Sequence, residues 1–315
     1  MEVEGIGCVP YRAAARVAVD ELNDILHDLE PVLGPLSGPV TALEGGITNH
    51  NFRAKLGDGD YVIRIHGRRT ELLGINRQAE LLASEAAAHL GIGPTVAATL
   101  EHCLVTRFLE CSAVDSREVA ERVEEIARAL RAFHASGRLP ARFWVPDLLD
   151  DYAGIVRRRS GTLPGAFAEA VAVAARIAHA LPLRHPHPCH NDLLAGNILS
   201  ALDDGRIVIV DWEYAGMGHP CFDLGNLSIN NHFDQATDER LLAAYRHESP
   251  SRGVLAALKL MRVLSDAREA AWAVVQGAIS DLDFDFERYG REHFARLHAA
   301  AAHADFDEWL ATAEW

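Results

Sequence analysis

The sequence predicts an α+β protein of two lobes, a small β-rich lobe followed by a larger and mainly helical one. Residues 39–110 contain short apolar runs of alternating polarity, separated by Gly-rich turns, which is the pattern of strands. After residue 110 the apolar residues recur at helical spacing. A chain of 315 residues is long enough for two domains, and its composition, 49% hydrophobic and 24% charged, is typical of a packed protein in water.

The predicted domains are a helical N-terminal extension (1–38), a β-rich lobe (39–110) and a helical lobe (111–315), with a cleft between the two lobes. The extension is a helix, "YRAAARVAVDELNDILHDL", that ends at Pro31 and a cluster of Gly and Pro. The β-rich lobe is predicted to have five strands, within "VTALEGGITNHNFRAKLGDGDYVIRI", "TVAATL" and "CLVTRFL", and one inserted helix over 76–90.

The helical lobe begins with "SREVAERVEEIARALRAFHAS", predicted as one helix with acids early and arginines late, as the helix dipole favours. Further helices are predicted near 147–159 and 164–181. A small β element then interrupts them, carried by "PCHNDLLAGNIL" and "RIVIVDWEYA". From "FDLGNLSINN" to the end the pattern is helical again.

Charge and cysteine content limit the partners. The formal charge of −15 argues against nucleic acid, because phosphate backbones need a basic face. It suits a cationic substrate through steering, although it also serves solubility alone. Five cysteines without a CxxC pair indicate free thiols in a reducing cytoplasm. We expect no signal peptide and no membrane span. A homodimer is left open.

One group of polar residues points to phosphate chemistry. Asp192 follows His190 by two residues, Asn197 comes five residues later, and Asp211 follows the apolar run "RIVIV". Phosphoryl transfer needs a carboxylate that takes the acceptor's proton and oxygen ligands for Mg²⁺. This spacing, H-x-D-x4-N and then a second Asp, predicts Asp192 as the base and Asn197 with Asp211 as metal ligands. Turn chemistry explains any one of these residues but not the whole set. We expect His190 to brace the loop.

The motifs "CHNDLLAGNIL" and "DWEYAG" resemble those of the aminoglycoside phosphotransferase and choline kinase superfamily, which has a protein-kinase-like fold. The resemblance runs from about residue 40 over most of the chain. "LEGGITNHNFR", "DWEYAGMGHPCFDLGN" and "AWAVVQGAISDLDFDFERYG" are similar to the choline/ethanolamine kinase branch. The resemblance implies an enzyme that uses ATP and Mg²⁺.

The nucleotide-binding prediction starts from the Gly-rich turn "EGGITN". Gly45 and Gly46 let the backbone approach a phosphate, and Thr48 and Asn49 add side-chain donors. A Gly-Gly turn alone is weak evidence, because hairpins use it often.

A cation and a hinge complete this prediction. Arg64 alternates with apolar strand residues and is expected to face the phosphates, or else to be an exposed strand arginine. Its expected partner is Glu85, with Glu80 as the alternative. "TRFLE" is similar to the hinge segment, where backbone groups from Phe108 to Glu110 contact adenine.

The acceptor prediction rests on aromatic residues and carboxylates, which suit a quaternary ammonium. Trp272 and Tyr289 match aromatic wall positions of choline kinases, and Glu213 and Tyr214 are expected nearby. Trp272 in the core is the alternative. The branch often has a second Trp three residues before Trp272, where this chain has Glu269, so ethanolamine or thiamine also fits.

The predicted function is therefore an ATP- and Mg²⁺-dependent kinase that phosphorylates the hydroxyl of a cationic amino alcohol, choline or ethanolamine first. An aminoglycoside or thiamine kinase is the alternative enzyme. A non-catalytic nucleotide-binding regulator is a further alternative, against which the intact set of Asp192, Asn197 and Asp211 argues.

Overall fold

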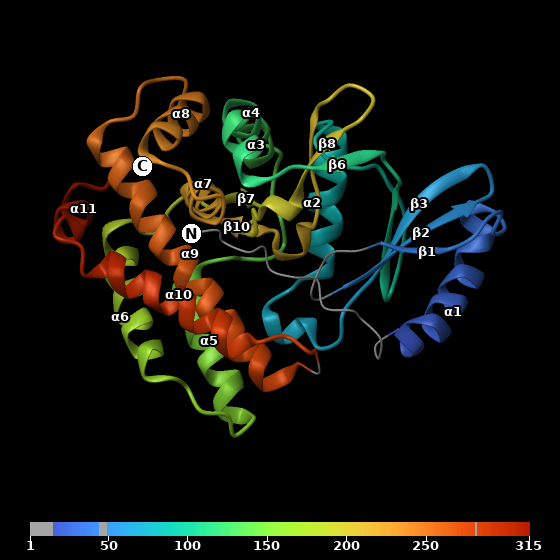
Figure 1. The fold of residues 1–315 in the computed structure, drawn as a ribbon, viewed down its shortest axis with the longest axis horizontal. Coiled ribbons are helices and arrows are strands. Elements are labelled where there is room, and N and C mark those ends of the chain that lie inside the picture. The colour runs from blue at the N-terminus through green and yellow to red at the C-terminus, as the bar shows by residue number, and fades with distance from the viewer. Residues whose placement is uncertain (1–14, 44–48, 281) are drawn as a thin grey trace, which may run out of the picture. The chain divides into compact units, whose positions relative to one another are not determined.

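The computed structural model describes residues 15–43, 49–280 and 282–315 (Figure 1). The chain divides into two compact units, a β unit and a helical unit. The β unit takes in residues up to Arg68 together with Val96–Phe108. The helical unit takes in Arg69–Thr95 and Leu109–Trp315. The helix predicted within the β-rich lobe, α2 (Arg77–His89), therefore groups with the helical unit.

The β unit is a five-stranded antiparallel sheet in the order β1-β2-β3-β5-β4. Its strands are β1 (Thr41–Leu43), β2 (His50–Leu56), β3 (Gly59–Ile65), β4 (Val96–Leu100) and β5 (Cys103–Arg107). Along β3 the buried residues alternate with half-buried ones, which confirms the period of two. Helix α1 (Ala15–Leu33) packs in the same core through Leu22, Ile25 and Leu29, which share one helix face.

The end predicted for the N-terminal helix is wrong by two residues. Helix α1 continues through Pro31 and ends at Leu33. Pro31 lies in the last turn, so the hydrogen bond that its missing N–H cannot donate is lost near the C-terminal end of the helix. Gly34 then takes φ +91° and donates its N–H to the Glu30 carbonyl at 2.9 Å, which closes the helix. A Cβ at Gly34 would meet the Gly57 Cα at 2.8 Å, so the turn also needs glycine for space.

The helical unit carries ten α-helices and two small sheets in its described residues. The helices are α2, α3 (Ser116–Glu121), α4 (Val123–His134), α5 (Val145–Arg158), α6 (Gly165–Ala180), α7 (Pro220–Asn230), α8 (Gln235–Arg246), α9 (Arg252–Ile279), α10 (Phe286–Ala301) and α11 (Phe306–Thr312). The strands are β6 (Cys111–Ala113), β7 (His187–Cys189), β8 (Ile198–Ala201), β9 (Ile207–Ile209) and β10 (Gly216–Gly218). The single helix expected over 116–136 is broken at Arg122 into α3 and α4.

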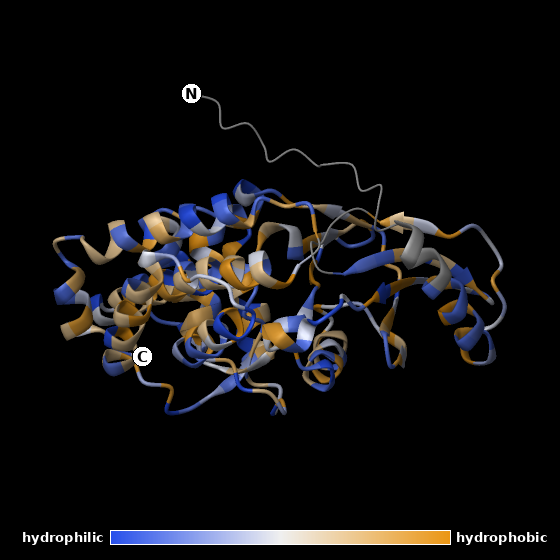
Figure 2. Cartoon of the chain, turned by 90° about the horizontal axis from the view of Figure 1, so that it is seen from below, coloured by the Kyte–Doolittle hydropathy of each residue, from blue (hydrophilic) through white to orange (hydrophobic). Residues whose placement is uncertain are grey.

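Helix α9 is the centre of this unit. It is 28 residues long and buried on most sides, since α5, α6, α7, α10 and α11 all pack against it (Figure 1). Figure 2 shows hydrophobic segments concentrated inside the helical unit and hydrophilic ones on its outward-facing helices. Within the described part of the chain, no helix combines the length and the apolar character that a membrane crossing requires. Cys103, Cys111, Cys189 and Cys221 are free thiols.

Two small sheets flank the loops that carry the predicted catalytic and metal-binding residues. Strands β6, β8 and β9 form one antiparallel sheet, and β7 pairs with β10 in another. The loop from His190 to Asn197 joins β7 to β8, and Asp211 follows β9 after one further residue, Val210. A short 3₁₀ turn, η3 (Trp212–Tyr214), then leads into β10. The two predicted motifs thus follow β7 of one small sheet and β9 of the other.

Candidate active site

A buried carboxylate on helix α7 fixes the loop that carries Asp192. Asp223 is fully buried, and its two oxygens accept the backbone N–H groups of His190 and Asn191, both at 2.7 Å. The ring Nε2 of His134 also lies 2.9 Å from Asp223 Oδ2. Asn226, one turn further along α7, accepts the N–H of Leu193. Side chains from one helix therefore hold the backbone on both sides of Asp192.

His134, Cys189 and Asp223 also lie close enough together to raise the question of a metal site. All three are buried, and each Asp223 oxygen already accepts a backbone N–H at 2.7 Å. Both oxygens are thus engaged by donors that face them, which is the geometry of a structural clamp rather than of a set of ligands.

His190 ties the loop to the strand that precedes Asp211. Its Nδ1 accepts the Asp192 N–H at 3.2 Å, and its Nε2 lies 2.9 Å from the Val210 carbonyl. The ring also packs against Trp212, with centroids 4.6 Å apart. With both nitrogens in such contacts, the imidazole braces the loop, as expected from the sequence.

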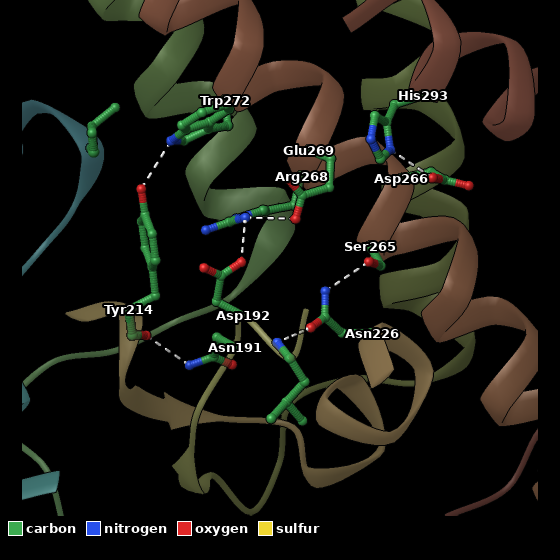
Figure 3. Close-up of polar contacts among 12 residues, drawn as sticks. Asn191, Asp192, Tyr214, Asn226, Ser265, Asp266, Arg268, Glu269, Trp272 and His293 are labelled. Carbon is green, nitrogen blue, oxygen red and sulfur yellow. Dashed lines mark hydrogen bonds and ion pairs between the residues drawn. The ribbon is translucent and has the colours of Figure 1, made fainter. Parts of the chain in front are cut away.

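Asp192 is only 8% exposed and lies in a strongly charged environment. Its Oδ1 is 3.1 Å from Nη1 of Arg268, which is itself buried (Figure 3). Burial raises the pKa of Asp192 to about 7. Arg268 opposes this shift, and the negative charges of Glu269, Asp211 and Glu213 add to it. A carboxyl group with a pKa near neutrality can both take and release a proton at the pH of a cell.

Asn197 and Asp211 each carry a side-chain oxygen, Asn197 at the end of the His190–Asn197 loop and Asp211 in the segment after β9. Asn197 Nδ2 donates to the Asp192 backbone carbonyl at 2.8 Å, which directs Oδ1 the other way. Asp211 has a left-handed backbone, φ 66° and ψ 60°, at the end of β9, and its side chain is half-buried. Such strain in a non-glycine residue is typical of functional positions. Carboxylate and amide oxygens are the ligands that Mg²⁺ prefers, so this donor set fits the ion.

The predicted aromatic wall is assembled on α9, α10 and η3. Trp272 Nε1 donates to the Tyr214 hydroxyl at 2.9 Å, and the Trp272 and Tyr289 rings meet edge to face with centroids 5.9 Å apart. The Tyr289 hydroxyl donates to Glu269 Oε2 at 2.9 Å. Trp272 is 6% exposed and also contacts the Phe286 ring, so it lies in the core, and its contact with an acceptor stays a prediction.

The same region contains an arginine that the sequence did not single out. Arg268 contacts Asp192, lies 2.6 Å from Glu269 Oε1 and stacks 4.2 Å from the centre of the Tyr214 ring. Burial alone would raise the pKa of Glu269, but Arg268, His293 and the Tyr289 hydroxyl together lower it. Glu269 is therefore an ionised acid where the related branch often has tryptophan.

Glu213 and Glu80 are buried, whereas Glu85 is exposed. Glu213 is 3% exposed and lies 3.5 Å from Arg77 Nη1. Arg77 also contacts Glu80, which is 1% exposed, at 2.7 Å. Glu85, the partner preferred for Arg64, is exposed on α2. The partner of Arg64 stays a prediction.

The predicted phosphate loop lies largely outside the described residues, which leave out Gly45, Gly46 and Thr48. Asn49 is buried, and its Oδ1 accepts the Gly67 N–H at 3.1 Å. Arg64 lies on β3, opposite Asn51 on β2 and Leu104 on β5. The position of Arg64 in the centre of the sheet fits the sequence pattern, and its contact with phosphate stays a prediction.

The two named hinge residues already use part of their backbone. The Phe108 N–H donates to the Asp60 carbonyl at 2.9 Å, and the Phe108 ring lies under Arg53 at 3.7 Å. The Glu110 carbonyl accepts the Leu202 N–H at 2.8 Å, and its side chain is exposed. Adenine recognition by the other backbone groups of the Phe108–Glu110 segment stays a prediction.

Asp223, Asn226 and Arg268 are the site residues that sequence reasoning missed. The segment "CFDLGN" was noticed for its resemblance, and its Asp and Asn three residues apart were a usable signal, since that spacing puts both on one helix face. Arg268 gave a weaker signal: a charged Arg-Glu pair, "RE", inside a helix that is otherwise apolar around it.

The fold is that of the protein-kinase-like phosphotransferases, and solved structures that match nearly the whole chain share it. A model of the phosphotransferase enzyme family matches residues 39–258, so the chain belongs to that family. Within it, a choline/ethanolamine kinase family protein of Mesorhizobium loti is 31% identical, with a TM-score of 0.78 and coverage of 93% of this chain and 98% of the other. The chain is thus a member of the choline/ethanolamine kinase family.

Two further relatives are more distant. Ethanolamine kinase 2 of Homo sapiens is 26% identical over 329 residues, which cover 89% of this chain and 83% of the human protein. A choline kinase of Streptococcus pneumoniae, also solved in complex with AMP, is 24% identical with a TM-score of 0.77, over 90% of this chain and 99% of the other. At that sequence identity, the structural similarity shows a shared fold.

Proposed function

We propose that this protein transfers the γ-phosphoryl group of ATP to the hydroxyl of a small amino alcohol of the ethanolamine and choline class. The observation that carries the proposal is the position of Asp192, a buried carboxylate fixed by α7 and placed beside the wall of Trp272, Tyr214 and Tyr289. The names of the M. loti and human relatives support the acceptor class.

Asp192 accepts the hydrogen bond of the acceptor hydroxyl and takes its proton as the bond to phosphorus forms. A general base of this kind contributes on the order of 100- to 10,000-fold in rate. The loop clamp by Asp223 and Asn226 keeps the carboxylate in place, which removes the need to order it in the transition state.

Asn197 Oδ1 and the Asp211 carboxylate are the residues that would hold Mg²⁺. When bound, the ion neutralises charge on the phosphates of the nucleotide. The predicted nucleotide contacts, from the Gly45–Asn49 turn, from Arg64 with Glu85 or its alternative Glu80, and from the Phe108–Glu110 segment, complete the proposal. The AMP complex of the S. pneumoniae choline kinase supports an adenine nucleotide.

The acceptor's cation would face the rings of Trp272, Tyr214 and Tyr289. Ring faces suit either a trimethylammonium or an ammonium group. The ionised Glu269 in the wall adds an acceptor for N–H donors, which only an ammonium can supply. This favours a primary amine such as ethanolamine over choline.

The proposal is tested by measuring ATP consumption against ethanolamine, choline, thiamine and an aminoglycoside, with and without Mg²⁺. We expect turnover with ethanolamine above that with choline, and none in the presence of a chelator. Turnover with thiamine or the aminoglycoside alone would replace the proposed acceptor class. ATP and Mg²⁺ binding without turnover of any acceptor would support the regulator alternative instead.

A further inference from the structure

Arg268 is buried in the acceptor region with only part of its guanidinium group engaged. Its side chain is 2% exposed. Nη1 contacts Asp192 at 3.1 Å and Glu269 at 2.6 Å, and the Tyr214 ring covers one face at 4.2 Å from its centre (Figure 3). These contacts use the Nη1 nitrogen and one face of the guanidinium group. The edge formed by Nε and Nη2 takes part in none of them.

That edge consists of Nε and Nη2, and neither atom has a hydrogen-bond partner in the described part of the chain. Buried guanidinium N–H groups without partners are costly, and native proteins rarely keep them. The Nε and Nη2 atoms point the same way and match the two oxygens of a carboxylate. Arg53 uses the same two atoms on Asp60, Arg122 on Glu125 and Arg240 on Glu124.

We propose that the open edge of Arg268 binds a carboxylate of the acceptor itself, so that the substrate is an alcohol bearing both an ammonium and a carboxylate. This inference rests on the proposed function and narrows its substrate class to hydroxy amino acids and their N-methylated forms. The ammonium faces the aromatic wall and the acids Asp192 and Glu269, while the carboxylate lies on Arg268. The two ends of such a zwitterion meet groups of opposite charge in one buried region.

The charge around Arg268 agrees with a zwitterion. The guanidinium already faces two buried carboxylates, Asp192 and Glu269, so a lone anion would add repulsion. An anion that arrives together with an ammonium group leaves the net charge of the region unchanged. An acceptor with only an ammonium would leave the Nε and Nη2 edge without a partner when bound.

The first test compares two matched pairs of compounds, ethanolamine with serine and choline with N,N,N-trimethylserine. Within each pair the second compound adds only a carboxylate. Binding to the full chain in the presence of Mg²⁺ and ADP is measured by titration calorimetry. We expect the carboxylated member to bind about 10- to 100-fold more tightly, the scale of one charge-assisted hydrogen bond. Equal binding, or weaker binding of the carboxylated member, overturns the inference.

The second test uses Arg268→Lys, which keeps a positive charge near Asp192 and Glu269 but has no planar edge. We expect the advantage of the carboxylated member to fall about 10-fold or more. Arg262→Lys is the matched control, because Arg262 lies on the same helix and pairs with Asp238 at 2.9 Å. This control should keep the full advantage. Circular dichroism checks that both variants fold. If Arg268→Lys does not fold, the first test still decides the question, because it uses the wild-type protein.

The outcomes separate three cases. If Arg268→Lys weakens ADP binding and leaves the advantage of the carboxylated member unchanged, the edge serves the nucleotide phosphates and the inference is overturned. If ethanolamine or choline is phosphorylated and the carboxylate confers no advantage, only the inference fails. If the carboxylated compounds bind through Arg268 and no compound is phosphorylated, Arg268 binds carboxylates, but the proposed function fails and the assignment of these compounds as substrates is overturned with it.

Discussion

At the scale of single residues, the environment of Asp192 is set by two opposing effects. Burial and three neighbouring acids favour the protonated carboxyl, and Arg268 favours the ionised one, with a pKa of about 7 as the result. Arg268 is therefore as important to the state of the base as the acids that surround it. A residue of this kind cannot be assigned from a motif, because Arg268 and Asp192 are 76 positions apart in the sequence and meet only in the folded protein.

Asp192→Asn tests the base directly. The amide keeps the size of the side chain but cannot take a proton, so we expect kcat to fall by about 100-fold or more. Nucleotide binding should persist, and it can be followed by the change in melting temperature on adding ATP and Mg²⁺. Turnover within a few fold of the wild type would remove Asp192 from the role of base.

At the scale of elements, helix α7 determines the geometry of the catalytic loop. It begins at Pro220, after His219, whose Nδ1 accepts the Cys221 N–H at 3.2 Å as an N-terminal cap. From this helix Asp223 and Asn226 reach the backbone of the loop. The helix in turn packs on α9, and Asn226 donates to Ser265 there at 2.9 Å.

Asp223→Asn tests whether Asp223 acts by holding the loop that carries Asp192 in position. The substitution replaces one acceptor oxygen with an N–H₂ group that faces a backbone N–H donor. We expect a loss of about 2–4 kcal/mol in the free energy of unfolding. We also expect a fall in kcat of about 10- to 100-fold, because the loop is displaced. Urea denaturation and steady-state kinetics measure the two effects.

Asp238→Asn is the control for this change. Asp238 is also buried, on α8, where it contacts Ser228 and Arg262 and does not touch the loop in the described contacts. It should lose stability and keep kcat. Equal kcat losses in both variants would show that the effect of Asp223 is general destabilisation.

His219 predicts a loss of stability in acid. Burial, with added repulsion from His187 and His134, lowers its pKa to about 4 from the usual 6.5. As the pH falls below 6.5 the unfolded chain takes up this proton and the folded protein does not, so the unfolded state is favoured. The stability present above pH 6.5 should decrease by about 3 kcal/mol by pH 4.

His219→Asn keeps a capping acceptor and removes the titration. Urea denaturation at pH 7, 5.5 and 4 should show a steeper loss in the wild type than in the variant. Parallel losses over this range would mean that other groups account for the acid sensitivity.

Much of this architecture was predictable from the sequence, and the exceptions have physical reasons. Strands such as β3 were found because alternation along one strand is a local property of the sequence. The break at Arg122 was missed because the apolar spacing continues from α3 into α4. Asp192, Asn197 and Asp211 were found through their spacing along the chain. Arg268 was missed because its contact with Asp192 joins residues 76 positions apart.

At the scale of the whole molecule, the charge of −15 gives the protein a negative field. Acidic residues outnumber basic ones by 45 to 30. Small cations are attracted by such a field and small zwitterions respond much less. The ionic-strength dependence of the acceptor's KM therefore reports on the acceptor's charge.

For ethanolamine we expect KM to rise a few fold between about 20 and 300 mM salt, since the Debye length falls over that range. For serine the change should be smaller. Sucrose at matched osmolality serves as the control, because it leaves the electrostatic screening unchanged. A KM for ethanolamine that is independent of salt would show that its binding owes nothing to the field.

The clamp on α7 has a consequence for motion. The amides of His190, Asn191 and Leu193 belong to a loop, yet they donate to side chains that are buried in a helix. Such amides exchange their hydrogens for deuterium only when the helix itself opens. In deuterated water the catalytic loop should therefore keep its hydrogens about as long as α7 does, and far longer than exposed turns such as the one around Asp203 and Asp204. Asp192, the proposed base, is thus carried by a segment that has the shape of a loop and is expected to exchange its amide hydrogens as slowly as the core.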